Sequence, residues 1–325
     1  MSETLLKING LKKHFPIKGG FFGRTIGAVA AVDDVSLSIS TGKTMGLVGE
    51  SGCGKTTAGR TVIRLLEPTA GDVYFKDENI LDLNGKGLKR IRRRMQIVFQ
   101  DPYSSLNPRI TVGSMITEIL RFHNIVPPNE IPEKVIDVME SVGLVPDYAG
   151  RYPHEFSGGQ RQRIGIARAL SVEPDFIVLD EPVSALDVSI QAQIINLLVD
   201  LQEKYNLTYL FIAHDLSVVE HISDEIAVMY LGRIVETGRA KDVIDNPLHP
   251  YTNALLDAVP LPDPNMRQDK AILIGDVPSP SNPPSGCHFH PRCPVAKKSC
   301  ADWDYRLIDQ ANNRKVACML LDSKG

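Results

Sequence analysis

A glycine-rich stretch, GESGCGKTT at residues 49–57, constrains the fold of this 325-residue chain more than any other feature. It follows an apolar run of strand length, TMGLVG, and leads into TAGRTVIRLLE, a helix-like segment with Pro68 and Gly71 behind it as stop signals. Strand, loop and helix in this order are the context that the phosphate-binding pattern G-x-x-x-x-G-K-[ST] requires. The sequence therefore predicts a nucleotide-phosphate site.

The loop residues suit the binding of a nucleoside triphosphate. Backbone N–H groups can surround the phosphates, Lys55 can pair with the β and γ oxygens, and the Thr56 hydroxyl can bind Mg²⁺. An ordinary glycine-rich turn is the alternative, and the flanking strand and helix argue against it. The expected binding residues are Gly49, Glu50, Ser51, Gly52, Cys53, Gly54, Lys55, Thr56 and Thr57. The side chain of Cys53 is expected to point away from phosphate.

Two carboxylates complete this chemistry. Asp180 ends the apolar run FIVLD, where a buried strand leaves the sheet, and Glu181 follows it. A carboxylate in this place completes the Mg²⁺ shell of phosphate-loop enzymes, and a second one can accept the proton of an attacking water. Alone, such a pair is more typical of a helix cap or a surface turn. Together with the phosphate loop it indicates hydrolysis.

Apolar periodicity predicts an α/β fold around these residues. DVYFKD, MQIVFQ, FIVLD and LTYLFIAH have the length and composition of strands. The helix between the last two carries on one face Ile190, Ile194, Leu197, Leu198 and Leu201. This alternation indicates a mostly parallel sheet. Residues 1–40 alternate like a β-rich module around the glycine-rich KGGFFG, and helical spacing over 101–169 indicates an inserted helical subdomain.

Composition narrows the class of protein. The net charge is −3 and the isoelectric point is near 6.3, so no global positive field attracts nucleic acid or acidic lipid. The N-terminus lacks a secretory-signal pattern, and no stretch reaches the roughly 20 apolar residues that span a bilayer. The basic run KRIRRRM at 89–95 is interpreted as a solvated face. We expect a soluble chain that can dock on a membrane protein and has no nucleic-acid partner.

Over roughly residues 5–245 the motifs together resemble the nucleotide-binding subunit of an ATP-binding-cassette (ABC) transporter. The family's motifs occur here in order: the phosphate loop Gly49–Thr56, the glutamine-loop residue Gln100, the signature SGGQ at 157–160, the Walker B end Asp180–Glu181, the D-loop residue Asp187 and the switch residue His214. The resemblance implies a phosphate-loop, RecA-like ATPase core with an N-terminal antiparallel β subdomain and an inserted helical subdomain.

The resemblance also implies a role for each motif. ATP would be held by the phosphate loop, with Mg²⁺ on Thr56, Gln100 and Asp180, and Glu181, Gln100 and His214 would act in hydrolysis. Phe15 in KKHFP stands where the family's adenine-stacking aromatic falls. Phe156 replaces the leucine that is common at the head of the signature, a tolerable apolar exchange.

SGGQ is followed by a helix, so Ser157, Gly158, Gly159 and Gln160 make a second anion site at a positive helix end. Because the phosphate loop already holds one face of the nucleotide, the resemblance implies that SGGQ meets the γ-phosphate bound by a partner chain. Two subunits would then close head-to-tail on two ATP molecules and reopen after hydrolysis.

A narrower resemblance covers nearly the whole chain. QDPYSSLNPR at 100–109, HPYTNALLDAVP at 249–260 and the cysteine-bearing tail resemble the ATPase subunits of bacterial oligopeptide/dipeptide importers, and KKHFPIKGG resembles their F-type subunit. This implies a related ATPase partner, two membrane permeases and an external peptide-binding protein, with the chain peripheral on the cytoplasmic face of the bacterial membrane. Nickel importers share much of the pattern. A soluble cassette ATPase acting on DNA or ribosomes is disfavoured by the single phosphate loop and the short insert before SGGQ.

The tail suggests a metal site. Beyond about residue 246 prolines accumulate, and the sequence suggests a second unit over 246–325 after an ATPase domain over 1–245. Four cysteines with C-x5-C-x6-C-x17-C spacing occur there: Cys287, Cys293, Cys300 and Cys318. Their spacing lacks the tight pair usual for zinc, whereas the importer family implies a [4Fe–4S] cluster, so a cluster is expected, with Zn²⁺ or unliganded thiols as alternatives.

Overall fold

The computed structural model describes residues 3–19, 24–258 and 275–322. Two stretches singled out in the sequence, KGGFFG and the end of HPYTNALLDAVP, lie partly outside these ranges. The described residues form two compact units. The first takes its residues from 3–5, 40–43 and 82–212, and the second from 6–19, 24–39, 44–81, 213–258 and 275–322.

The sheet of the first unit is parallel. Its strands are β6 (Met95–Val98), β7 (Phe176–Asp180) and β8 (Thr208–Ala213). β7 pairs with both neighbours, and its register places Asp180 opposite Ile212 of β8. Every residue of β7 and β8 is buried, as the continuous apolar runs predicted. α7 (Val188–Tyr205) connects these two strands and buries Ile194, Ile195, Leu198 and Leu201, so the βαβ prediction is confirmed.

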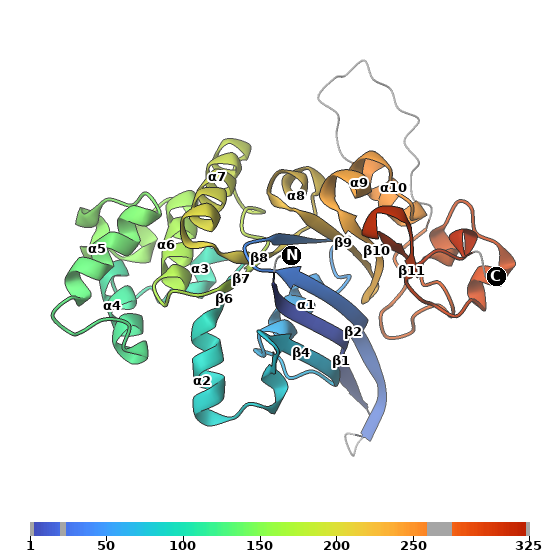
Figure 1. Ribbon diagram of the computed structural model, residues 1–325, viewed down its shortest axis with the longest axis horizontal. Coiled ribbons are helices and arrows are strands. Elements are labelled where there is room, and N and C mark those ends of the chain that lie inside the picture. Colours follow the sequence, from blue (N-terminus) through green and yellow to red (C-terminus); the bar gives the residue numbers. More distant parts are fainter. Residues whose placement is uncertain (1–2, 20–23, 259–274, 323–325) are drawn as a thin grey trace. The chain divides into compact units, whose positions relative to one another are not determined.

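Helices occupy most of the segment 101–169, as its periodicity predicted. The first unit contains α2 (Gly85–Arg94), α3 (Pro102–Ser105), α4 (Val112–His123), α5 (Ile131–Ser141) and α6 (Gly158–Leu170). α4, α5 and α6 lie side by side (Figure 1). α4 begins where the Thr111 side chain accepts a hydrogen bond from the Ser114 N–H, and it ends at Asn124, whose φ of 51° leaves the helical region.

An antiparallel sheet forms the N-terminal part of the second unit. Its strand order is β2-β1-β4-β5, with β1 (Thr4–Gly19), β2 (Arg24–Ser40), β4 (Ala70–Phe75) and β5 (Glu78–Asn79). β1 and β4 place Leu6 opposite Phe75 and Ile8 opposite Val73, and all four side chains are buried. The predicted antiparallel β subdomain is therefore present.

A second group of strands completes this unit. β3 (Thr44–Val48) runs parallel to β9 (Glu225–Tyr230), and β9 is antiparallel to β10 (Arg233–Arg239). The tail adds β12 (Lys315–Val316) to the free edge of β10, and β11 (Ile308–Asp309) follows it. The helices here are α1 (Lys55–Val62), α8 (Leu216–Ile222), α9 (Ala240–Asp245) and α10 (Pro250–Asp257).

α1 is shorter than TAGRTVIRLLE suggested. It ends at Val62 because Arg64 takes a positive φ of 55°, which breaks the helical hydrogen-bond pattern. The Arg64 guanidinium then donates to the carbonyl of Ile80 at 3.0 Å. Short 3-10 helices lie at Ile80–Asp82, Pro146–Gly150, Pro153–Glu155, His290–Arg292, Lys298–Ala301, Ala311–Asn313 and Met319–Leu321. Across the described ranges, the helices are all too short or too polar to cross a bilayer.

Candidate nucleotide-binding site

The phosphate loop connects β3 to α1 in the second unit. Gly52 and Gly54 have φ values of 80° and 110°, a backbone region that favours glycine. A Cβ at Gly54 would lie 2.0 Å from the carbonyl oxygen of Ala31, whereas a Cβ at Gly52 would meet nothing within 4 Å. The N-cap residue of α1 is Gly54, which has no side chain to cap the helix. An open, glycine-lined turn at an uncapped helix N-terminus fits a phosphate group.

Lys55 is the first residue of α1, and its side chain is only 4% exposed. Its ammonium group donates hydrogen bonds to the carbonyls of Gly49 at 2.7 Å and Glu50 at 3.0 Å. These carbonyls compensate a buried positive charge directly beneath the loop. Cys53 is also buried, and burial raises the pKa of its thiol, so the group stays neutral. The expectation that it points away from phosphate remains a prediction.

Glu50 connects the loop to the tail of the chain. The Arg292 guanidinium donates to both Glu50 carboxylate oxygens, at 2.8 and 3.0 Å, and the Tyr251 hydroxyl accepts the Glu50 N–H at 2.8 Å. Neither Arg292 nor Tyr251 was among the site residues predicted from the sequence. Tyr251 lies in a segment singled out for a family resemblance and Arg292 lies among the tail cysteines, and no sequence pattern relates either residue to residue 50.

Phe15, the expected adenine-stacking residue, lies in β1 and is 38% exposed. Its ring therefore presents a face on which a planar base can stack. The Lys13 ammonium lies 4.9 Å from the centroid of this ring. The exposure and the neighbouring cation fit the expected role of Phe15, and the position remains a prediction.

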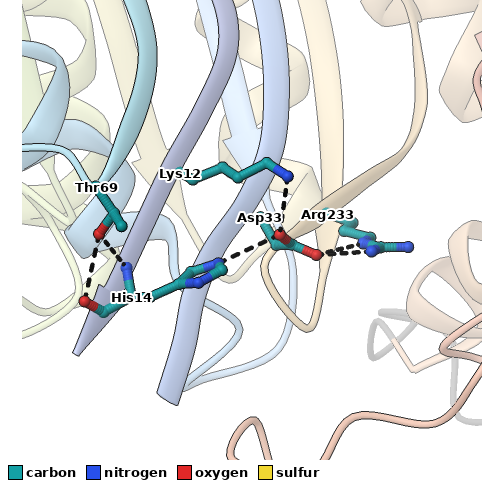
Figure 2. Close-up of polar contacts among 5 residues, drawn as sticks. All are labelled: Lys12, His14, Asp33, Thr69 and Arg233. Carbon is teal, nitrogen blue, oxygen red and sulfur yellow. Dashed lines mark hydrogen bonds and ion pairs between the residues drawn. The ribbon is translucent and has the colours of Figure 1, made fainter. Parts of the chain in front are cut away.

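A polar cluster holds β1, the strand that contains Phe15 (Figure 2). The backbone N–H of His14 donates to the Thr69 hydroxyl at 2.9 Å, and the ring Nε2 of His14 lies 3.3 Å from the Asp33 carboxylate. Arg233 donates to the other oxygen of Asp33 at 2.8 Å. Burial alone would raise the pKa of Asp33, but the hydrogen bond and charge of Arg233, together with Lys12, hold it below its usual value. The cluster thus joins β1, β2 and β10 through an ionised carboxylate.

In the first unit the structure brings Gln100 and Glu181 together. Asp180 is the buried last residue of β7, and Glu181 follows it with a positive φ of 47°. The Glu181 N–H donates to the Ile212 carbonyl at 3.0 Å, and Gln100 Nε2 donates to the Glu181 carboxylate at 2.9 Å. A non-glycine residue in a left-handed conformation is unusual, and such strain concentrates at functional sites.

The signature residues begin α6. Ser157 and Gln160 form a capping box: the Ser157 hydroxyl accepts the Gln160 N–H, and the Gln160 side chain accepts the Ser157 N–H. Gly158 is exposed and Gly159 is partly exposed. A Cβ at Gly159 would lie 2.6 Å from Ile190 of α7, so this position requires a glycine.

Two further motif residues stand at element ends. Asp187 is the exposed N-cap residue of α7, and its carbonyl accepts the N–H groups of Ile190 and Gln191. His214 follows β8 directly and is exposed. Asp187 belongs to the first unit and His214 to the second.

The expected iron–sulfur cluster is a wrong prediction, and so is its zinc alternative. Among the residues that the structure describes, no group of three or more His, Cys, Asp or Glu side chains could hold a metal ion. Burial raises the pKa of Cys287 to about 11 and also raises those of Cys293 and Cys318, so these thiols favour the protonated form. The four cysteines are free thiols, and Cys300 and Cys318 are buried.

Comparison with known proteins identifies the family. Residues 32–184 match the ABC transporter family, and residues 235–300 match the family "Oligopeptide/dipeptide transporter, C-terminal region". The oligopeptide transport ATP-binding protein AppF of Bacillus subtilis is 55% identical, over 98% of this chain and 98% of its own length. The dipeptide transport ATP-binding protein DppF of Haemophilus influenzae is 49% identical, over 99% of this chain and 98% of its own length.

Solved structures give the same result. The chain resembles cbiO1 from Clostridium perfringens, part of the ABC transporter complex cbiONQ, with a TM-score of 0.64, 27% identity and coverage of 75% of this chain and 92% of that one. It also resembles the ATP-binding cassette MJ0796 in a dimeric post-hydrolysis state bound to ADP and Pi, with a TM-score of 0.64, 28% identity and coverage of 73% and 99%. The chain belongs to the ABC transporter family, as an ATPase of the group that carries the oligopeptide/dipeptide transporter C-terminal region.

Proposed function

We propose that this chain is the ATP-hydrolysing subunit that powers import of di- or oligopeptides across the cytoplasmic membrane. The open, glycine-lined turn at the uncapped start of α1, above the buried Lys55, is the observation that carries the ATPase. The peptide substrate is supported by two relatives of nearly equal length that are named for oligopeptide and dipeptide transport. These names favour peptide over nickel, and nothing in them favours nucleic acid.

The ATP-site residues have separate tasks in this proposal. The loop Gly49–Thr57 holds the phosphates, Phe15 stacks on the adenine, and Mg²⁺ is held by Thr56, Gln100 and Asp180. Bound Mg²⁺ neutralises charge on the phosphate oxygens. Glu181 accepts the proton of the attacking water, and His214 contacts the γ-phosphate. The hydrogen bond from Gln100 to Glu181 supports this assignment because it orients the carboxylate that acts as the base.

The signature acts on the nucleotide of a partner in this proposal. The start of α6 faces the partner's γ-phosphate through Ser157, Gly158, Gly159 and Gln160. Asp187, the D-loop residue, lies beside them in the proposed dimer. The dimeric cassette structure at 28% identity supports such an arrangement. Shifting a two-state equilibrium from 1:99 to 99:1 needs about 5.5 kcal/mol, and each charge-assisted hydrogen bond contributes about 1.5–3 kcal/mol. A few γ-phosphate contacts therefore suffice to close the dimer, and hydrolysis reopens it.

ABC transporter subunits of this group act with membrane permeases. We propose a complex with one homologous ATPase subunit, two transmembrane permeases and an external peptide-binding protein. The chain would bind peripherally at the cytoplasmic face of the bacterial membrane. Within it, residues 1–245 form the ATPase domain and residues 246–325 the importer-type extension. The match of residues 235–300 to the transporter C-terminal region supports this division.

Glu181→Gln tests the proposal directly. The exchange keeps the shape of the side chain and removes the base, so ATP should still bind while phosphate release falls by about 100-fold or more. When ATP is present, a stable dimer of this variant with the related ATPase subunit should accumulate. Turnover is measured as phosphate release by the co-purified transporter with candidate peptides, and dimer formation by size-exclusion chromatography.

The control is Glu173→Gln in the same unit. Glu173 is exposed and pairs with Lys134 at 2.7 Å, so losing its charge should leave turnover at the parental level. A Glu181→Gln chain that hydrolyses ATP at the parental rate would refute the assignment of the base. Stimulation of the parental complex by nickel and not by any peptide would refute the proposed substrate.

A further inference from the structure

Two side chains from the tail hold a single residue of the phosphate loop. Arg292 contacts the Glu50 carboxylate through both terminal nitrogens, at 2.8 and 3.0 Å. Paired contacts of this kind fix the plane of the carboxylate as well as its position. The Arg292 side chain is 6% exposed and that of Glu50 is 25% exposed. The pair is therefore shielded from the water and salt that weaken ion pairs on protein surfaces.

The second contact is with the backbone of the loop. The Tyr251 hydroxyl accepts the N–H of Glu50 at 2.8 Å, and the Tyr251 side chain is fully buried. Burial raises the pKa of this hydroxyl, so it remains neutral at physiological pH. Glu50 is thus held at its main chain and at its carboxylate by two separate segments of the tail.

An aromatic cluster supports both contacts. The Tyr251 ring lies 4.6 Å from Tyr230, centroid to centroid, and each lies 5.3 Å from Phe289. All three side chains are buried. Tyr230 is the last residue of β9, Tyr251 lies in the first turn of α10, and Phe289 directly precedes the 3-10 turn that carries Arg292. Packed rings with few rotamers restrict the movement of the groups attached to them.

We propose that the tail beyond residue 245 is a positioning element for the phosphate loop, acting through the Arg292–Glu50 ion pair and the Tyr251–Glu50 hydrogen bond. Arg292 and Tyr251 are positioning residues and are assigned no contact with the nucleotide. They hold the start of the loop in the shape that presents its later N–H groups to phosphate. The inference rests on the proposed role of the loop in ATP binding.

The predicted effect concerns nucleotide affinity more than the chemical step. The loop surrounds phosphates both before and during hydrolysis, so loosening it weakens ground-state and transition-state binding alike. Such a loss raises KM and leaves kcat nearly unchanged. A purely stabilising contact would lower the melting temperature and leave KM at the parental value.

The experiment measures KM for ATP, kcat and binding of a fluorescent ATP analogue, using the full chain in complex with its partner subunits. Arg292→Gln should raise KM and the analogue Kd about tenfold, the scale of one charge-assisted contact, with kcat changed less than about twofold. Arg292→Lys, which keeps the charge but not the paired geometry, should recover part of this loss. Tyr251→Phe, which removes only the hydroxyl, should raise KM about threefold.

Matched controls lie elsewhere in the tail. Tyr305 is partly buried and donates its hydroxyl to the Ile234 carbonyl, and Arg306 pairs with Asp322, so Tyr305→Phe and Arg306→Gln each remove a similar contact away from the loop. Both should leave KM at the parental value. Arg292→Gln combined with Glu50→Gln should raise KM no further than Arg292→Gln alone, because one pair carries both effects.

The outcomes separate this inference from the proposed function. Failure of the parental complex to bind the ATP analogue would refute the proposed function itself. Normal parental binding, with KM unchanged in Arg292→Gln, would overturn the positioning role alone. Additive effects of Arg292→Gln and Glu50→Gln would also overturn it, because Arg292 would then act independently of Glu50.

Discussion

His249 combines two structural tasks, one through its side chain and one through its backbone. It is 1% exposed, and its Nδ1 accepts the Tyr251 N–H at 3.1 Å, which starts α10. Its backbone N–H donates at 2.9 Å to the carboxylate of Glu236, a residue with no exposed surface. Arg314 neutralises that carboxylate. The residue that begins α10 is thus fixed by a buried charge pair.

The titration of His249 leads to a prediction. Burial lowers its pKa to about 3, from an ordinary value of 6.5. Between these values the unfolded chain binds a proton that the folded chain does not, so the unfolding free energy falls as pH falls, by up to about 1.4 kcal/mol per pH unit. His249→Asn keeps an N-cap acceptor and cannot titrate, so its unfolding free energy should depend less steeply on pH. Urea denaturation at pH 6.5 and 5.0 measures both slopes; equal slopes would contradict a buried neutral histidine.

The helix α6 combines a proposed recognition site with close packing. Its capping box of Ser157 and Gln160 satisfies backbone groups at the helix start. Gly159, in the same first turn, lies against Ile190 of α7, where a Cβ would approach to 2.6 Å. The absence of a side chain at Gly159 is therefore favoured by packing within the chain itself, besides the proposed contact of SGGQ with a partner's nucleotide.

This packing predicts the sign of a substitution. An alanine in a helix normally stabilises it by about 1 kcal/mol relative to glycine, but Gly159→Ala should destabilise the chain by about 1–3 kcal/mol because of the contact with Ile190. Adding Ile190→Ala should remove most of that clash. Gly158→Ala, whose Cβ would lie 3.3 Å from Leu186, is the milder control. Urea denaturation measures all three variants, and a stabilised Gly159→Ala would show that α7 yields at this point.

The sequence predicted elements better than it predicted contacts between them. β7 was expected as FIVLD because a run of four apolar residues needed a buried sheet position, and these four and Asp180 are all buried. α1 was expected to be longer. The backbone leaves the helical region at Arg64, and an arginine does not signal a positive φ as a glycine or asparagine would. The tail cysteines were interpreted from their spacing and from a family resemblance, and neither shows how the fold places the side chains; no metal-holding group is found among the described residues.

At the scale of the whole chain, the nucleotide loop depends on distant segments. Within the second unit the Cys53 carbonyl accepts the N–H of Gly232, and Glu50 is held from residues 251 and 292. These partners follow the loop by about 180 to 240 positions, a separation at which local patterns have no predictive value. The loop can reach its final environment only after the last quarter of the chain has folded onto β9 and β10.

The proposed dimer extends this dependence to a second chain and predicts an effect in trans. Ser157→Ala should lower the rate of ATP hydrolysis at the partner's phosphate loop at least about 100-fold, while the phosphate loop of the variant chain itself stays active. Mixed dimers of one variant and one parental subunit test this prediction. Vanadate traps a photoreactive ATP analogue at active sites, and the label is counted separately on each subunit.

Loss of the Ser157 cap alone costs about 1 kcal/mol of stability. Thr111→Ala, which removes the cap of α4 in the same unit, controls for that loss and should leave both sites labelled. Labelling lost from the variant's own loop, with the partner's loop intact, would mean that SGGQ acts in its own chain and that no nucleotide is shared.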